Sequence, residues 1–150
     1  MPVTAAFSLA MARKALLGTD DPWSDNWQVV PLDDDPSTID KGTVYADLHP
    51  VFAPLNVGTW SIQPYQEPGD PPPPEELLPY AYCASPAAQW TNEEEATLTI
   101  RALAVIAQNT ITQDYDLLFW QAIEPPIVVP PGDTFVLENL RFAFGGLADA

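Results

Sequence analysis

Carboxylates are the most numerous side chains in this sequence that are able to take part in catalysis or metal binding. Three consecutive aspartates occupy residues 33–35, and three consecutive glutamates occupy residues 93–95. Calcium loops place their oxygen ligands at alternate positions, in a D-x-D-x-D-G pattern, and neither run has this spacing. We therefore expect residues 33–35 to form a solvated turn and residues 93–95 to form a charged turn, without a metal or glycosidase site.

The other reactive groups are one histidine, His49, and one cysteine, Cys83. His49 precedes a proline and has no evident acid–base or metal-binding partner in the sequence. Cys83 has no neighbouring basic residue that would activate it, and a single cysteine cannot form an internal disulfide. Walker, G-x-G-x-x-G, G-x-S-x-G and H-E-x-x-H motifs are also absent. We expect no enzymatic activity and no cofactor, with a small hydrolase kept as a minor alternative.

The net charge restricts the classes of partner. Twenty-one Asp and Glu residues face five Lys and Arg residues, which gives a formal net charge of −16. Such a charge repels nucleic-acid phosphates and anionic membranes, so we expect neither as a partner. Colloidal solubility or a saline habitat explains an acidic composition as well as a functional acidic surface does, and these interpretations stay open.

Residues 97–144 predict the β-strands around which the rest of the chain is organised. The runs T-L-T-I-R-A-L-A-V-I-A-Q, Y-D-L-L-F-W-Q-A-I, T-F-V-L-E and L-R-F-A-F are rich in β-branched and aromatic residues and are separated by Asn, Asp, Pro and Gly. In the first run Leu98, Ile100 and Ala102 are expected on one face and Thr99 and Arg101 on the other. Because the second face becomes apolar at residue 103, the far half of this strand should be covered on both sides.

The preceding segments predict one helix and further short strands. Residues 4–17 favour a helix that Thr4 caps and Gly18 ends. The segments W-Q-V-V, stopped by Pro31, and T-V-Y-A-D-L-H-P-V-F, at residues 43–52, have strand character. Seven or eight short strands suggest a mainly β, single-domain β-sandwich or jelly-roll. We expect an N-terminal helix or arm at residues 1–18 and a β-sandwich at 19–150, with a proline-rich insertion at 67–79.

Several apolar and aromatic side chains are candidates for contacts with another protein. Trp23 and Trp27 are either lids on the core or an exposed pair of anchors. Residues 71–74 are four prolines that favour a polyproline rod, either a stiff loop or an arm on a neighbour. The helix needs a docking surface on its own sheet or on another subunit. The candidate interface residues are Phe7, Leu9, Leu16, Trp23, Trp27, Pro72, Pro73, Tyr80 and Tyr82.

The order of these strands and turns resembles a known class of protein. The succession A-L-A-V-I-A-Q, Y-D-L-L-F-W-Q-A-I-E-P-P-I-V-V, P-P-G-D-T-F-V-L-E and N-L-R-F-A-F is similar to the C-terminal part of small β-rich virion proteins of tailed bacteriophages. T-V-Y-A-D-L and G-T-W-S-I-Q resemble the middle of such proteins. The resemblance covers residues 43–64 and 97–144, and the insertion at 67–79 departs from it. It implies a structural protein of the virus particle without catalytic residues.

Within that class, a capsid cement or decoration protein is the first expectation. The resemblance implies a location on the outer capsid surface after synthesis in the host cytoplasm, with the major capsid protein as partner. It also implies self-association, as a homotrimer. The acidic charge suits an outer position, away from packaged DNA. A phage tail or receptor-binding module is the alternative.

Overall fold

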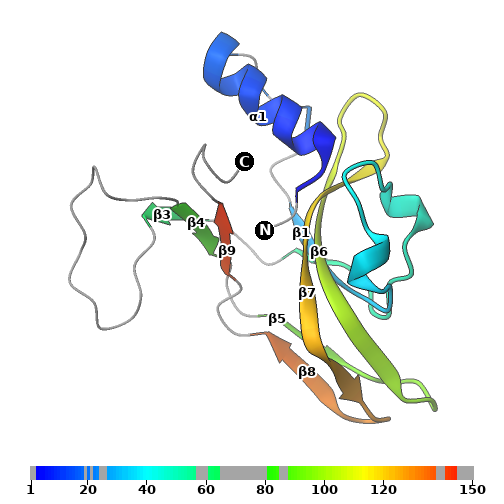
Figure 1. Cartoon of the computed structure of the whole chain (residues 1–150). Helices are drawn as coiled ribbons and strands as arrows, with labels where there is room; N and C mark the ends of the chain where they lie inside the picture. Colours follow the sequence, from blue (N-terminus) through cyan, green and yellow to red (C-terminus); the bar gives the residue numbers. More distant parts are fainter. Residues whose placement is uncertain are drawn as a thin grey trace.

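The structure is a computed structural model that describes residues 3–18, 20, 22–23, 27–56, 61–64, 81–84, 88–137 and 141–144. The chain is mainly β with one N-terminal helix, as predicted, and its elements are arranged as Figure 1 shows. The elements are α1 (Ala5–Leu17), β1 (Gln28–Leu32), the short 3-10 helices η1 (Pro36–Thr38) and η2 (Tyr45–Asp47), β2 (Leu55–Asn56), β3 (Ser61–Pro64), β4 (Ala81–Ala84), β5 (Ala88–Thr91), β6 (Leu98–Gln108), β7 (Tyr115–Val129), β8 (Thr134–Leu137) and β9 (Arg141–Phe144).

The strands pair in antiparallel fashion throughout the described residues. The largest sheet has the order β2-β1-β6-β7, and the smaller groups have the orders β3-β4-β9 and β5-β8. The long hairpin of β6 and β7 runs the length of the main sheet (Figure 1). In this part of the chain no helix combines the length and the apolar character needed to cross a bilayer.

The pairing of β6 with β7 has two irregularities. Ile100 pairs with Ile127 and Ala102 pairs with Ala122, so residues 123–126 of β7 lie opposite one residue of β6. Prolines within that stretch cannot donate to the ladder, which favours an irregularity there. The expected common face of Ile100 and Ala102 is therefore wrong, because Ile100 packs into one core cluster and Ala102 into the other.

The part of the main sheet around residues 102–107 of β6 is buried on both faces. Residues 102–107 of β6 are at most 1% exposed, which confirms the prediction that this half of the strand is covered on two sides. One cluster joins the sheet to α1, β5 and β8. The other cluster joins it to the connection between β1 and β2, through Ile39 with Tyr45 and Leu48 against it. Adjacent β1 residues Val29 and Val30 go to opposite clusters, as strand geometry requires.

The helix begins and ends where its sequence predicts. Thr4 accepts a hydrogen bond from the Phe7 backbone N–H at 3.2 Å, and Gly18 ends the helix in the left-handed conformation with φ 66°. The Thr4 hydroxyl also donates to the Leu117 carbonyl at 2.8 Å, and its N–H donates to the Leu118 carbonyl at 2.9 Å. These bonds attach the start of α1 to β7 at the second irregularity of the hairpin.

Two expected strand boundaries are wrong. Pro31 does not stop β1. Its carbonyl accepts a hydrogen bond from the Val51 N–H at 3.0 Å, on the side of β1 that faces away from β6. Its nitrogen lies on that same side, so the missing N–H costs no hydrogen bond to β6. Residues 43–52 do not form a strand. They turn through η2, where the N–H groups of Asp47 and Leu48 bond to carbonyls three residues earlier. Their β-pairing is limited to an isolated bridge between Pro50 and Leu32 of β1.

Candidate interaction surface

The three aspartates after β1 each have a partner. Asp33 accepts a hydrogen bond from Arg101 Nε at 3.2 Å, and Asp35 caps η1 by accepting from the N–H and the hydroxyl of Ser37. Asp34 accepts from the backbone N–H of His49 at 2.7 Å and contacts its Nδ1 at 2.9 Å. The described residues contain no group of three or more His, Cys, Asp or Glu that could hold a metal ion. The run is a structured turn.

The contact between Asp34 and His49 is a feature that the sequence did not predict. The two residues are fifteen positions apart, and the bond from the Asp33 N–H to the His49 carbonyl at 3.1 Å brings them together. The Asp34 side chain is 10% exposed, whereas that of His49 is 81% exposed. An acid–base pair of this kind also needs a substrate cavity or a nucleophile beside it. His49 lies outside the lining of the hollow described below.

The Asp34 contact makes stability depend on pH in a specific direction. The hydrogen bond to Asp34, followed by the charge of Asp34, raises the pKa of His49 above its ordinary value of 6.5. A group with a raised pKa in the folded state stabilises the protein below its unfolded pKa and loses this effect as the pH rises through the folded pKa. We therefore expect His49→Gln to destabilise the protein more at about pH 6 than at about pH 8.

Urea unfolding of both proteins at the two pH values measures this difference. His49 is the one histidine of the chain, so its ring protons give an unambiguous NMR titration. A midpoint at or below 6.5, or equal destabilisation by His49→Gln at both pH values, would contradict the Asp34 contact.

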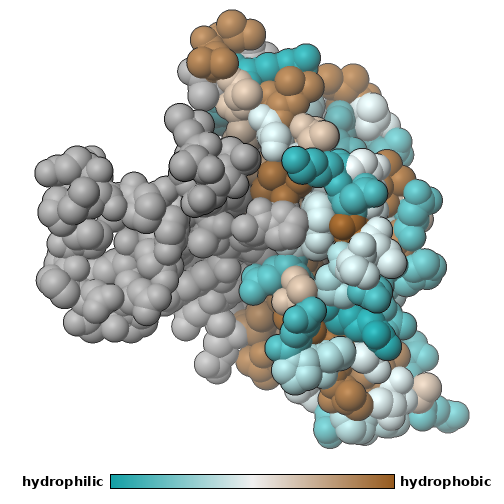
Figure 2. All heavy atoms as spheres, viewed as in Figure 1, coloured by the Kyte–Doolittle hydropathy of each residue, from teal (hydrophilic) through white to brown (hydrophobic). Residues whose placement is uncertain are grey.

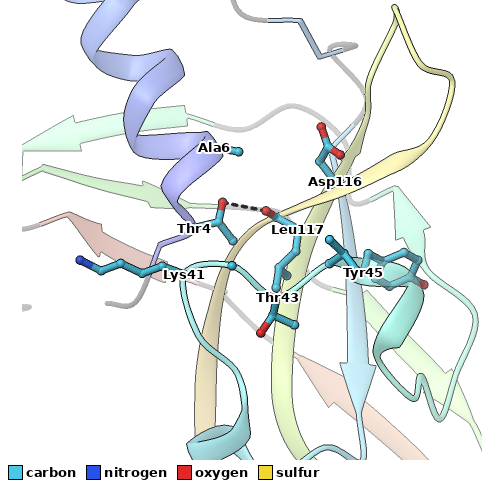
Figure 3. A pocket seen from close by; sticks show the side chains of 9 residues that line it. Thr4, Ala6, Lys41, Thr43, Tyr45, Asp116 and Leu117 are labelled. Carbon is cyan, nitrogen blue, oxygen red and sulfur yellow. Dashed lines mark hydrogen bonds between the residues drawn. The ribbon is translucent and has the colours of Figure 1, made fainter.

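A hollow of about 280 Å³ lies where the start of α1 meets β7 and the connection between β1 and β2. Figure 3 shows that the polar ends of Lys41, Thr43, Tyr45 and Asp116 point in different directions around it. Burial, followed by the charge of Tyr115, raises the pKa of Tyr45, and a neutral phenol is a poor base. These groups do not converge on one point, so the hollow offers shape and apolar surface without an evident catalytic arrangement.

The aromatic candidates near the N-terminus lie in or against the core. Phe7 and Trp23 are each 6% exposed, and their rings stack at 5.9 Å. Trp27 is half-buried and meets Phe7 and Phe119 edge-on at 6.0 and 6.2 Å. Trp23 Nε1 donates to Asp116 at 2.9 Å. Of the two interpretations of the tryptophan pair, the structure favours lids on the core over exposed anchors.

The structure describes only some of the remaining candidate interface residues. Pro72, Pro73 and Tyr80 lie outside the described residues, and for Tyr82 the structure describes only the backbone, within β4. Leu9 and Leu16 are 51% and 82% exposed on α1, which makes them available for contact.

Three large apolar side chains are highly exposed at the end of α1 and at the β6–β7 hairpin tip, where Figure 2 shows apolar spots separated by hydrophilic surface. Leu16, Leu17 and Ile111 are 82%, 74% and 81% exposed, the highest values among the large hydrophobic residues that the structure describes. The end of α1 and the tip of the β6–β7 hairpin both point to the same end of the molecule (Figure 1). The sequence did not single out Leu17 or Ile111. An isoleucine within the turn segment N-T-I-T-Q-D was the available signal.

The hairpin tip that carries Ile111 is held by many hydrogen bonds. Asn109 Oδ1 accepts from the N–H groups of Ile111 and Thr112 at 2.9 and 3.2 Å. The N–H and the hydroxyl of Thr110 both donate to the Pro22 carbonyl at 2.8 Å. These bonds fix the tip to the segment that follows α1, so the exposed isoleucine is presented by an ordered loop.

Comparison with known proteins gives no relative. No protein-family model, no curated protein and no solved structure matches this chain. A function for this chain therefore has to rest on its own sequence pattern, surface and charge.

Proposed function

We propose that this protein is a capsid cement or decoration protein of a tailed bacteriophage, which binds the major capsid protein on the outside of the shell and stabilises contacts between capsomers. The resemblance of residues 43–64 and 97–144 to small β-rich virion proteins supports the virion assignment, and the ordered hairpin tip with Ile111 81% exposed supplies the surface for docking. A jelly-roll or sandwich arrangement of the strand groups belongs to the same proposal.

The order, exposure and charge of this surface favour docking on a large partner with many identical sites. A loop that is already ordered loses little conformational entropy on binding. An apolar side chain presented by such a loop can act as an anchor in a protein contact. Each contact contributes little, yet many copies that each bridge neighbouring capsomers add up through avidity. The net charge of −16 is compatible with a position outside the shell and opposes contact with the packaged DNA.

Co-sedimentation with empty phage shells tests the proposal. We expect the wild-type protein to bind in hundreds of copies per shell, and Ile111→Glu to weaken binding about tenfold or more, because a charge replaces an apolar anchor. Val136→Glu is the matched control. Val136 is a half-exposed aliphatic residue on β8, at the other end of the main sheet in Figure 1, and its substitution should leave binding unchanged.

The other outcomes distinguish the alternatives. Wild-type protein that does not bind shells overturns the cement function. Binding to host cells, with only a few copies per virus particle, would instead favour the tail or receptor-binding module. Equal effects of Ile111→Glu and Val136→Glu would remove the hairpin tip as the contact.

A further inference from the structure

The helix α1 has two apolar sides. On the inner side Phe7 is buried, and Ala10 and Met11 pack against the same core cluster. The outer side carries a second stripe of exposed apolar residues at positions i, i+4, i+7 and i+11, namely Ala5, Leu9, Ala12 and Leu16. A helix that is apolar on opposite sides is typical of one that is covered on both, whereas a surface helix has a polar outer side.

The charge of α1 indicates what covers it. The first 18 residues contain Arg13 and Lys14 and no acidic residue, so they carry a formal side-chain charge of +2. Residues 19–150 hold the other three cationic residues and all twenty-one acids, a formal charge of −18. Arg13 is exposed beside the outer stripe. An acidic surface complements this helix, and a second helix of the same charge does not.

The same chain offers an acidic surface with a place for an apolar side chain. The connection between β1 and β2, residues 33–54, contains five aspartates and one lysine. Asp33, Asp35, Asp40 and Asp47 are exposed there. Val44, in the middle of the connection, is 53% exposed and borders the hollow of about 280 Å³. A leucine side chain from the outer stripe can pack against Val44, and Arg13 is opposite in charge to the aspartates.

We propose that the outer side of α1 binds the acidic connection of a second copy of this chain, in a head-to-tail contact. Different surfaces meet in such a contact, so its repetition builds either a closed ring or an open filament of copies. The two surfaces belong to different elements of one chain, α1 and residues 33–54. This inference goes beyond the proposed function, because the contact forms without any shell.

The oligomeric state of the purified full chain tests the contact. We expect the wild-type protein to associate, measured by analytical ultracentrifugation over a range of concentrations. The double variant Leu9→Glu/Leu16→Glu and the single variant Val44→Glu should each weaken association by at least about thirtyfold. All three residues are exposed, so circular dichroism and thermal unfolding should show intact folds. Ile111→Glu, which changes an equally exposed residue at the hairpin tip, is the control and should associate like the wild type.

Mixing the variants is the sharpest test of the head-to-tail geometry. The helix variant keeps an intact connection, and the Val44→Glu variant keeps an intact helix, so a mixture should form one-to-one dimers although each variant alone is monomeric. A mixture that stays monomeric, a wild-type protein that stays monomeric, or a helix variant that still associates overturns the inference.

Shell binding separates this inference from the proposed function. A wild-type oligomer that ignores shells would overturn the cement function and leave the self-contact intact. A wild-type monomer that binds shells, and loses this binding in Leu9→Glu/Leu16→Glu, would assign α1 to the shell and overturn the self-contact.

Discussion

Replacement of Phe7 by alanine is expected to lower the free energy of unfolding by about 3–5 kcal/mol. Phe7 is 6% exposed and packs against Trp23, Trp27 and Phe119 at ring distances of 5.5 to 6.0 Å. The substitution removes the ring and leaves a cavity between α1 and the main sheet. Urea unfolding followed by tryptophan fluorescence measures the loss, and the emission should also shift because Trp23 and Trp27 line the cavity.

Leu16→Ala is the matched control on the same helix. Leu16 is 82% exposed, so its truncation should change the free energy of unfolding by no more than about 0.5 kcal/mol under conditions where the chain is monomeric. Similar losses for the two substitutions would mean that α1 does not dock through Phe7. Since Thr4 and Phe7 belong to the core, point substitutions are better tests of the helix than deletion of residues 1–18, which would remove core packing as well.

Replacement of Asn92 by alanine is expected to cost about 3 kcal/mol or more, although it removes few atoms. Asn92 is 1% exposed, and its Nδ2 donates to the carbonyls of Ala96 and Val129, both at 2.9 Å. Its Oδ1 accepts from the Glu94 N–H at 2.9 Å. Truncation removes this partner from all three backbone groups. The bond to the Val129 carbonyl is buried, where an unsatisfied group costs about 1–3 kcal/mol, and each of the two part-buried bonds adds about 0.5–1.5 kcal/mol.

Asn92→Asp separates hydrogen bonding from size. Aspartate has the shape of asparagine, but an ionised carboxylate cannot donate and would face two carbonyl oxygens in a buried site. We expect it to be more destabilised than Asn92→Ala at neutral pH, and to recover part of the loss when acid protonates the carboxyl. Gln89→Ala, at an exposed β5 position, should be nearly neutral in the same unfolding experiment. An Asn92→Ala variant as stable as the wild type would contradict the role given to these bonds.

The sequence predicted best those features that depend on neighbours in the chain. The caps of α1 at Thr4 and Gly18, and the turn before β8, follow from the preferences of individual residues. The covered half of β6 followed from its run of apolar residues. These signals are local, so they do not depend on contacts with distant parts of the chain.

The features that were missed depend on contacts between distant segments. Asp34 meets His49 because two backbone bonds at the end of β1, from Asp33 to His49 and from Val51 to Pro31, hold the two segments together. The change of face between Ile100 and Ala102 arises from an irregularity in the partner strand, which the sequence of β6 does not reveal. The outward position of Ile111 depends on the bonds that tie the hairpin tip to Pro22. A candidate surface built from such contacts cannot be read from periodicity.

The long β6–β7 hairpin has a mechanical consequence. Its tip carries Ile111, while β6 is also paired along all five residues of β1. A force applied to the tip along the strands would load the hydrogen bonds of both ladders together, instead of opening them one after another. Residues 102–107 of β6 are packed on both faces, so sliding would also have to disrupt two core clusters at once. A tether at Ile111 would thus be held by the ladders of β1, β6 and β7 together, which would favour the proposed attachment to a shell.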